Sequence, residues 1–191
     1  MERFISIYAE STPNPESLKF MVNGDISQGL SFDFPDKESA VKSPLAEKLF
    51  EFPFVKGVFI NQNYVTITKD GEYPWVQLIP KIRAFMKEYL EAGNAIFTEE
   101  MFDAAPANMA MSEDSDIVIK IKNLLANSVK PVVEMDGGAI DFKSYAEGKV
   151  ILSLRGSCSG CPSSMVTLKG GIEALLKRLI PEIKEVEAEA L

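Results

Sequence analysis

The sequence contains no histidine, and this absence excludes several kinds of chemical site. Imidazole is the usual general base near neutral pH and the commonest nitrogen ligand for a metal, and Ser-His and Cys-His nucleophiles depend on it. None of the 191 residues can supply one. Catalysis or metal binding that requires imidazole is therefore excluded.

Cysteine is nearly absent as well. The chain has two, Cys158 and Cys161, which are too few for a disulfide scaffold. A close cysteine pair in a reducing compartment more often serves metal or redox chemistry. This pair is therefore the leading candidate for a functional site.

Long apolar runs and an excess of positive charge are also missing. No stretch approaches the roughly 20 apolar residues of a membrane span, and 28 acidic against 20 basic residues give a net charge of -8. A phosphate backbone would find no basic surface here. Residues 1–10 have too short an apolar run for a signal peptide and carry acids that a mitochondrial transit peptide avoids. We expect a cytoplasmic protein that binds neither nucleic acid nor a membrane.

The composition predicts folded structure in two parts. Hydrophobic residues make up 46% and charged residues 25%, the balance of an ordinary globular protein. A chain of this length can form two small domains, each with its own core. We expect an α+β fold of two domains at 1–93 and 115–191, joined by a linker at 94–114.

The first domain shows strand and helix signals in alternation. Its apolar runs are separated by turn-forming residues, and serine followed by proline is typical of a helix start. The predicted elements are strands at 4–9 and 18–22, a helix from Ser43-Pro44 to Phe50, a hairpin of strands at 55–60 and 64–68, and a helix from Pro74 to about Gly93. Between the domains we expect one helical turn, near residues 99–102.

The second domain is predicted to have the order α-β-β-α-β. Apolar residues from Ile117 to Val129 recur at helical spacing, and we expect that helix to stop near Pro131. The remaining elements are strands at 139–145 and 149–155, a helix at 162–179 and a short strand at 183–187. Gly170-Gly171 in that helix suggests close packing against the sheet, because glycine otherwise costs about 1 kcal/mol there.

This order places the cysteine pair between a strand and the N-terminus of a helix. Unpaired backbone N–H groups and the helix dipole favour thiolates at such a position. Gly160 permits a tight bend between the two cysteines, and Pro162 suits a first helical turn. The loop is therefore suited to binding a metal ion or an iron-sulfur cluster.

Ligand number then implies a second chain. Iron-sulfur clusters normally take four cysteine thiolates, and structural zinc takes four ligands, whereas this chain offers Cys158 and Cys161. Two chains would complete either site. A metal-free thiol-disulfide oxidoreductase is the alternative, although thioredoxin-like sites follow a βαβ unit that this pattern lacks. A zinc-bridged dimer and two ordinary thiols also remain open.

The residues around the pair resemble a known family. The run Gly-Ser-Cys-Ser-Gly-Cys-Pro-Ser-Ser at 156–164, preceded by Lys130-Pro131 and Asp136-Gly137-Gly138, is similar to the C-terminal domain of NifU-like (Nfu-type) iron-sulfur proteins over about 116–187. Residues 1–93, with Ser-Thr-Pro-Asn-Pro at 11–15, resemble the N-terminal domain found in many members.

This resemblance implies a carrier or scaffold that is not an enzyme. Such a protein holds an iron-sulfur cluster, commonly [4Fe-4S], between the subunits of a homodimer, with Cys158 and Cys161 as ligands by position. Its partners are a cluster donor and apo-protein acceptors. Ala139 departs from the family, which usually has an acid after Asp-Gly-Gly. Without the resemblance, an acid followed by two glycines, as in Asp136-Gly137-Gly138, predicts first of all a tight turn with positive φ.

Overall fold

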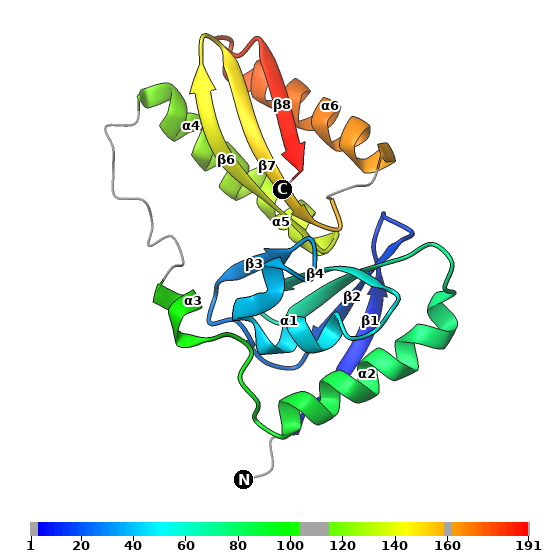
Figure 1. Cartoon of the computed structure of the whole chain (residues 1–191). Helices are drawn as coiled ribbons and strands as arrows, with labels where there is room; N and C mark the ends of the chain where they lie inside the picture. Colours follow the sequence, from blue (N-terminus) through cyan, green and yellow to red (C-terminus); the bar gives the residue numbers. More distant parts are fainter. Residues whose placement is uncertain (1–3, 104–114, 159–161, 191) are drawn as a thin grey trace. The chain divides into compact units, whose positions relative to one another are not determined.

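The computed structural model describes residues 4–103, 115–158 and 162–190, which fall into two compact units that divide near residue 106. Each unit combines helices with its own sheet, five strands in the first and three in the second (Figure 1). Each also has its own cluster of buried apolar side chains. The predicted α+β class is confirmed.

The sheet of the first unit is antiparallel throughout, in the order β1-β2-β5-β4-β3. Its strands are β1 (Ile7–Ser11), β2 (Ser17–Val22), β3 (Ser31–Phe34), β4 (Val55–Asn61) and β5 (Tyr64–Lys69). The predicted hairpin is β4–β5. The edge strand β3 was not predicted, because four residues are too few for alternation to stand out.

Two helices cover one face of this sheet. Ser43 caps α1 (Pro44–Leu49) by accepting a hydrogen bond from the backbone N–H of Ala46 at 3.2 Å, as the serine-proline signal predicts. A 3₁₀ turn, η1 (Ser39–Lys42), precedes it, and α2 (Trp75–Glu91) follows β5. The core forms where alternate strand residues meet α2: Leu18, Phe20, Val22, Val65, Ile67, Leu78, Ile82 and Met86.

The segment after α2 packs on the same core. Phe97 is 5% exposed, and its ring lies 4.5 Å from that of Phe32. The backbone N–H of Thr98 donates to the carbonyl of Lys42 at 2.9 Å. The short helix α3 (Glu99–Asp103) then follows, where one helical turn was expected.

The second unit has a three-stranded sheet in the order β6-β7-β8. β6 (Gly138–Ala146) and β7 (Lys149–Gly156) form an antiparallel hairpin, while β8 (Glu185–Ala190) pairs parallel to β7. A parallel neighbour requires a crossover, and α6 (Pro162–Leu179) provides it. The predicted order α-β-β-α-β is confirmed.

The first helix of this unit does not stop at Pro131. It runs through α4 (Asp116–Leu124), a π-helical turn, η2 (Leu125–Val129), and α5 (Lys130–Met135). Proline lacks an N–H, but Pro131 lies in the first turn of α5, where that donor is not needed. The wider π turn restarts the hydrogen-bond pattern just before it, so the predicted stop is wrong.

The exposed face of α6 carries Gly170 and Gly171. A Cβ added to either would meet nothing within 4 Å, so the predicted close packing is wrong. The buried face uses Ile172 and Leu176. Neither α6 nor any other helix within the described ranges is long and apolar enough to cross a membrane.

Candidate functional site

The candidate site begins where β7 ends. Gly156, with φ of 69°, turns the chain out of the sheet into Ser157 and Cys158, and α6 starts at Pro162. The cysteine loop therefore connects a strand to a helix, as predicted. Cys158 is buried at 5% exposure, and Cys161 lies outside the described residues.

The start of this loop is bonded to the turn that follows α5. The backbone N–H of Ser157 donates to the carbonyl of Gly137 at 3.2 Å, and its hydroxyl donates to the carbonyl of Asp136 at 2.5 Å. Gly137 has φ of 80°, so the predicted positive-φ turn is present. Ser157 therefore joins two segments about twenty residues apart in sequence and fixes the backbone just before Cys158.

Gly138 lies directly against the thiol. It pairs with Gly156 across the β6–β7 ladder. A Cβ at position 138 would lie 2.7 Å from Sγ of Cys158 and 2.8 Å from the carbonyl oxygen of Arg155. Non-bonded carbon and sulfur do not approach so closely, so the sulfur occupies space that any side chain at 138 would need.

Two cations share one carboxylate on the neighbouring part of the sheet. Asp141 on β6 forms ion pairs with Lys130, at 3.0 Å, and with Arg155. Burial raises the pKa of Asp141, but the Arg155 guanidinium and the Lys130 ammonium more than offset this, so its pKa lies below the usual value. The trio carries one net positive charge, and its Arg155 lies three residues before Cys158 in the sequence.

Ala139 takes part in this arrangement through its position. It pairs with Arg155 across the strands and is 7% exposed. Residues two apart on a strand share a face, so Asp141 places a carboxylate on the same face of β6 as position 139. The sequence analysis did not single out Asp141. Strand alternation from Ala139 was the signal that could have found it.

The N-terminal end of α6 adds to the same electrostatic pattern. Its first turn carries no acidic residue. In an 18-residue helix the backbone dipoles place partial positive charge at this end. An anionic group bound by the loop would meet no carboxylate from that turn.

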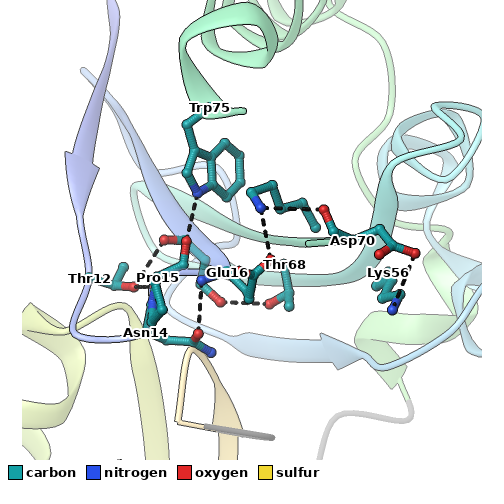
Figure 2. Close-up of polar contacts among 10 residues, drawn as sticks. Thr12, Asn14, Pro15, Glu16, Lys56, Thr68, Asp70 and Trp75 are labelled. Atoms are coloured by element: carbon teal, nitrogen blue, oxygen red, sulfur yellow. Dashed lines mark hydrogen bonds and ion pairs between the residues drawn. The ribbon is translucent and has the colours of Figure 1, made fainter. Parts of the chain in front are cut away.

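The loop of the first unit that carries the Ser-Thr-Pro-Asn-Pro run is held by its own polar groups (Figure 2). The Thr12 hydroxyl donates to the carbonyl of Asn14 at 2.9 Å, and the Asn14 side chain accepts from the Glu16 N–H at 3.0 Å. The Trp75 indole N–H donates to the carbonyl of Pro15 at 2.9 Å, which ties the loop to the start of α2. These hydrogen bonds explain the Ser-Thr-Pro-Asn-Pro run as a structural feature of the first unit.

A buried lysine completes that network. The Nζ atom of Lys69 lies 2.8 Å from a carboxylate oxygen of Glu16 and 5.5 Å from the centre of the Trp75 ring. No group of three or more Cys, Asp or Glu side chains in the described parts of the chain is arranged to hold a metal ion. Cys158 and Cys161 remain the candidate ligands.

Comparison with protein families matches both units. Residues 7–93 match the family described as "Scaffold protein Nfu/NifU N terminal", and residues 121–187 match "NifU-like domain". The chain belongs to the Nfu/NifU family. The family resemblance of the sequence is thereby confirmed.

Curated relatives of this family align over nearly the whole chain. The human "NFU1 iron-sulfur cluster scaffold homolog, mitochondrial" is 40% identical over 187 residues, covering 97% of this chain and 72% of that protein. "NifU-like protein 4, mitochondrial" of Arabidopsis thaliana is 39% identical, with coverage of 98% and 67%. The protein of Drosophila sechellia with the same name as the human one is 41% identical, and the chain spans 65% of its length.

Two solved structures also align with part of the chain. The solution structure of a NifU-like protein from Saccharomyces cerevisiae has a TM-score of 0.42 and 26% identity, covering 50% of this chain and 86% of that one. The crystal structure of protein SAV1430 from Staphylococcus aureus has a TM-score of 0.37 and 17% identity, with coverage of 42% and 98%.

The predicted cytoplasmic location is contradicted by the Nfu/NifU relatives. The human, Drosophila and Arabidopsis proteins are named as mitochondrial. The prediction depended on residues 1–10, and their composition is informative only if they include the targeting segment. The cytoplasmic assignment is therefore wrong.

Proposed function

We propose that this protein is a non-enzymatic iron-sulfur cluster scaffold and carrier, in which Cys158 and Cys161 from each of two subunits hold one [4Fe-4S] cluster for transfer to apo-proteins. The names of the human and fly relatives include the words "iron-sulfur cluster scaffold". A cluster donor and apo-protein acceptors are the partners that such a role requires. The cluster is cargo in this proposal.

The observation that carries the proposal is the ligand count at the β7–α6 loop. The whole sequence has two cysteines and no histidine, and both cysteines belong to this loop. A cluster normally takes four thiolates. A second copy supplies the other two with the same residues, which is the symmetric arrangement expected of a homodimer.

The charges on the segments before and after the loop are compatible with an anionic group. The Lys130, Asp141 and Arg155 trio has a net positive charge, and the first turn of α6 adds no acid. Both features lower the cost of bringing thiolates and sulfide together. A site divided between two chains also suits transfer, because acceptor thiolates can replace one chain's pair before the other's.

The arrangement around the loop favours this role over a metal-free oxidoreductase. A thioredoxin-like site follows a βαβ unit, whereas an antiparallel hairpin, β6–β7, precedes Cys158 here. The parallel crossover through α6 comes after the loop. A metal-free oxidoreductase remains the alternative function, and reconstitution must distinguish it from the cluster carrier.

Anaerobic reconstitution with iron and sulfide tests the proposal. We expect a brown protein whose native mass equals two chains plus one [4Fe-4S] cluster, and which restores activity to an apo-enzyme that needs such a cluster. Cys158→Ser and Cys161→Ser should each abolish stable loading. Ser144→Ala, which changes an exposed residue of β6, is the matched control and should load like the wild type.

Three other outcomes would contradict the proposal in different ways. A colourless monomer without iron, with a reversible Cys158–Cys161 disulfide, would indicate the oxidoreductase. A colourless dimer containing zinc would indicate a structural metal bridge. A loaded dimer that never passes its cluster to the apo-enzyme would leave a binding protein without the carrier role.

A further inference from the structure

We infer that Gly138 is a positioning residue for the Cys158 thiolate: its missing side chain provides the space that sets where Sγ points. The consequence for cluster binding rests on the proposed function, whereas the steric relation itself does not. The inference assigns a role beside the site to a glycine that the sequence explains only as part of a turn.

Backbone conformation does not account for this glycine. Within the turn, Gly137 has φ of 80°, a value that side chains rarely adopt, but Gly138 is not among the positive-φ residues. Gly138 is also the first residue of β6 and pairs with Gly156. Glycine weakens a strand, so another reason is needed for it at this position.

Space supplies that reason. A Cβ on Gly138 would lie 2.7 Å from Sγ, 3.3 Å from the Cys158 nitrogen and 2.8 Å from the Arg155 carbonyl oxygen. Two of these three atoms belong to the backbone of β7 and the loop, which Ser157 ties to the turn. The sulfur is the one atom of the three that can move by side-chain rotation, so alanine would displace it first.

Displacement of Sγ would be transmitted to the shared site. Cluster ligands must converge within a few tenths of an ångström, and a small misplacement of a supporting residue weakens such sites strongly. In a site formed by two chains the substitution is present in each subunit, so both Cys158 sulfurs would be displaced. We therefore expect Gly138→Ala to lose cluster loading while the unit still folds.

The first experiment compares Gly138→Ala with Gly170→Ala in the full chain. Gly170 has nothing within 4 Å of an added Cβ, so it controls for the glycine-to-alanine change. Iron retained after desalting should fall about tenfold or more in Gly138→Ala, the size seen when a supporting residue of a metal site is removed. In Gly170→Ala it should match the wild type. Normal loading of Gly138→Ala would overturn the inference.

A second experiment needs no cluster. The variants form a double-mutant cycle of Gly138→Ala with Cys158→Ala, each as the metal-free chain. For each variant we measure the urea concentration at the midpoint of unfolding, using hydrogen exchange of the β6 amides as the probe. Removing the sulfur should recover at least about half of the midpoint lost on Gly138→Ala, because residues in contact are non-additive. Additive effects would show that the Arg155 carbonyl, and not the thiol, requires glycine, and would overturn the inference.

The two experiments separate this inference from the proposed function. If the wild-type chain never loads a cluster, the carrier role fails while the coupling between positions 138 and 158 still decides the positioning role. If the single variant Gly138→Ala does not fold, the inference requires that the double variant with Cys158→Ala be more stable than the single variant. A double variant that folds no better would overturn the inference.

Discussion

The substitution Asp141→Asn tests whether the charged trio of Lys130, Asp141 and Arg155 stabilises the second unit electrostatically. Asparagine keeps the shape of the side chain and removes its charge. In the native protein Asp141 lies 3.0 Å from Nζ of Lys130 and also pairs with Arg155. The substitution would remove the carboxylate with which both cations pair.

The size of the effect follows from solvent exposure. The Lys130 and Asp141 side chains are 40% and 39% exposed, and Arg155 is 18% exposed. Water screens such pairs, so each contributes about 0.2–1 kcal/mol, with the less exposed Arg155 pair at the upper end. We expect Asp141→Asn to lower the free energy of unfolding of the second unit by about 1 kcal/mol at pH 7.

The pH dependence gives the sharper result. The pKa of Asp141 in the folded protein lies below its usual value, despite the opposing effect of burial. The carboxylate therefore stabilises the fold fully above its unfolded pKa of about 4, and this stabilisation is lost as the pH falls through the folded pKa. The difference between wild type and Asp141→Asn should be largest at pH 7 and should shrink towards pH 3.

Hydrogen exchange of the β6 and β7 amides is the suitable measurement. The single tryptophan, Trp75, lies in the first unit, so its fluorescence does not report on this sheet. A loss of about 1 kcal/mol corresponds to roughly fivefold faster exchange through global opening. Glu182→Gln, which removes a carboxylate at an exposed position between α6 and β8, is the control and should leave exchange near the wild-type rate.

Two results would refute this reasoning. Equal acceleration at pH 7 and pH 3 would mean that Asp141 acts through shape or hydrogen bonding and not through charge. Unchanged exchange at pH 7 would mean that the trio contributes no stability.

Four substitutions in the first unit can be followed by Trp75 fluorescence during urea unfolding. Phe97→Ala should lower the free energy of unfolding by about 3–5 kcal/mol through the cavity it leaves, and a loss below about 1 kcal/mol would show that residues 94–103 are not part of this core. Ser43→Ala should cost about 1–2 kcal/mol, because it removes the cap of α1, and an unchanged midpoint would contradict that role. Lys69→Met should be within about 1 kcal/mol of neutral, and Glu16→Gln should cost more because it leaves a buried ammonium without its carboxylate. The reverse order would contradict the assignment.

Local signals in the sequence predicted most elements of the fold. Ser43-Pro44 marks the start of α1 because a cap and a fixed φ act on neighbouring residues. The α6 helix was predicted with its observed bounds from Pro162 and from the helical spacing of its apolar residues. The π turn before Pro131 was not, because it resolves a conflict between proline and a helix that packing continues beyond it.

The candidate site could be predicted only in part. Ligand identity depends on residue type, so the sequence alone was enough to propose Cys158 and Cys161 as ligands, and that assignment stays a prediction. The contacts of Ser157 with Asp136 and Gly137 join segments far apart in the chain, and no local pattern signals them. Gly170-Gly171 shows the opposite error, since a glycine pair was explained by packing that the structure does not contain.

The register of the β6–β7 pairing connects the local sequence signals with the contacts at the candidate site. The hairpin turn at Glu147 and Gly148 sets the pairing at its end, where Ala146 lies opposite Lys149. Unbroken pairing from that turn would bring Ala139, not Gly138, opposite Gly156. An irregularity between Phe142 and Ser144 shifts the register by one residue and restores Gly138 to that position.

This bulge therefore determines which side chain lies against the thiol. A one-residue shift in a strand also exchanges its two faces, so the same irregularity places Asp141 where it meets Arg155. The cysteines and the glycines are visible in the sequence, but their juxtaposition depends on one extra residue in β6. Deleting Lys143 removes this extra residue and leaves every other pair, from Gly138–Gly156 to Ala146–Lys149, in one continuous register. We therefore expect the deletion variant to load a cluster as the wild type does, and a loss of loading comparable to that of Gly138→Ala would show that the bulge acts through more than the register.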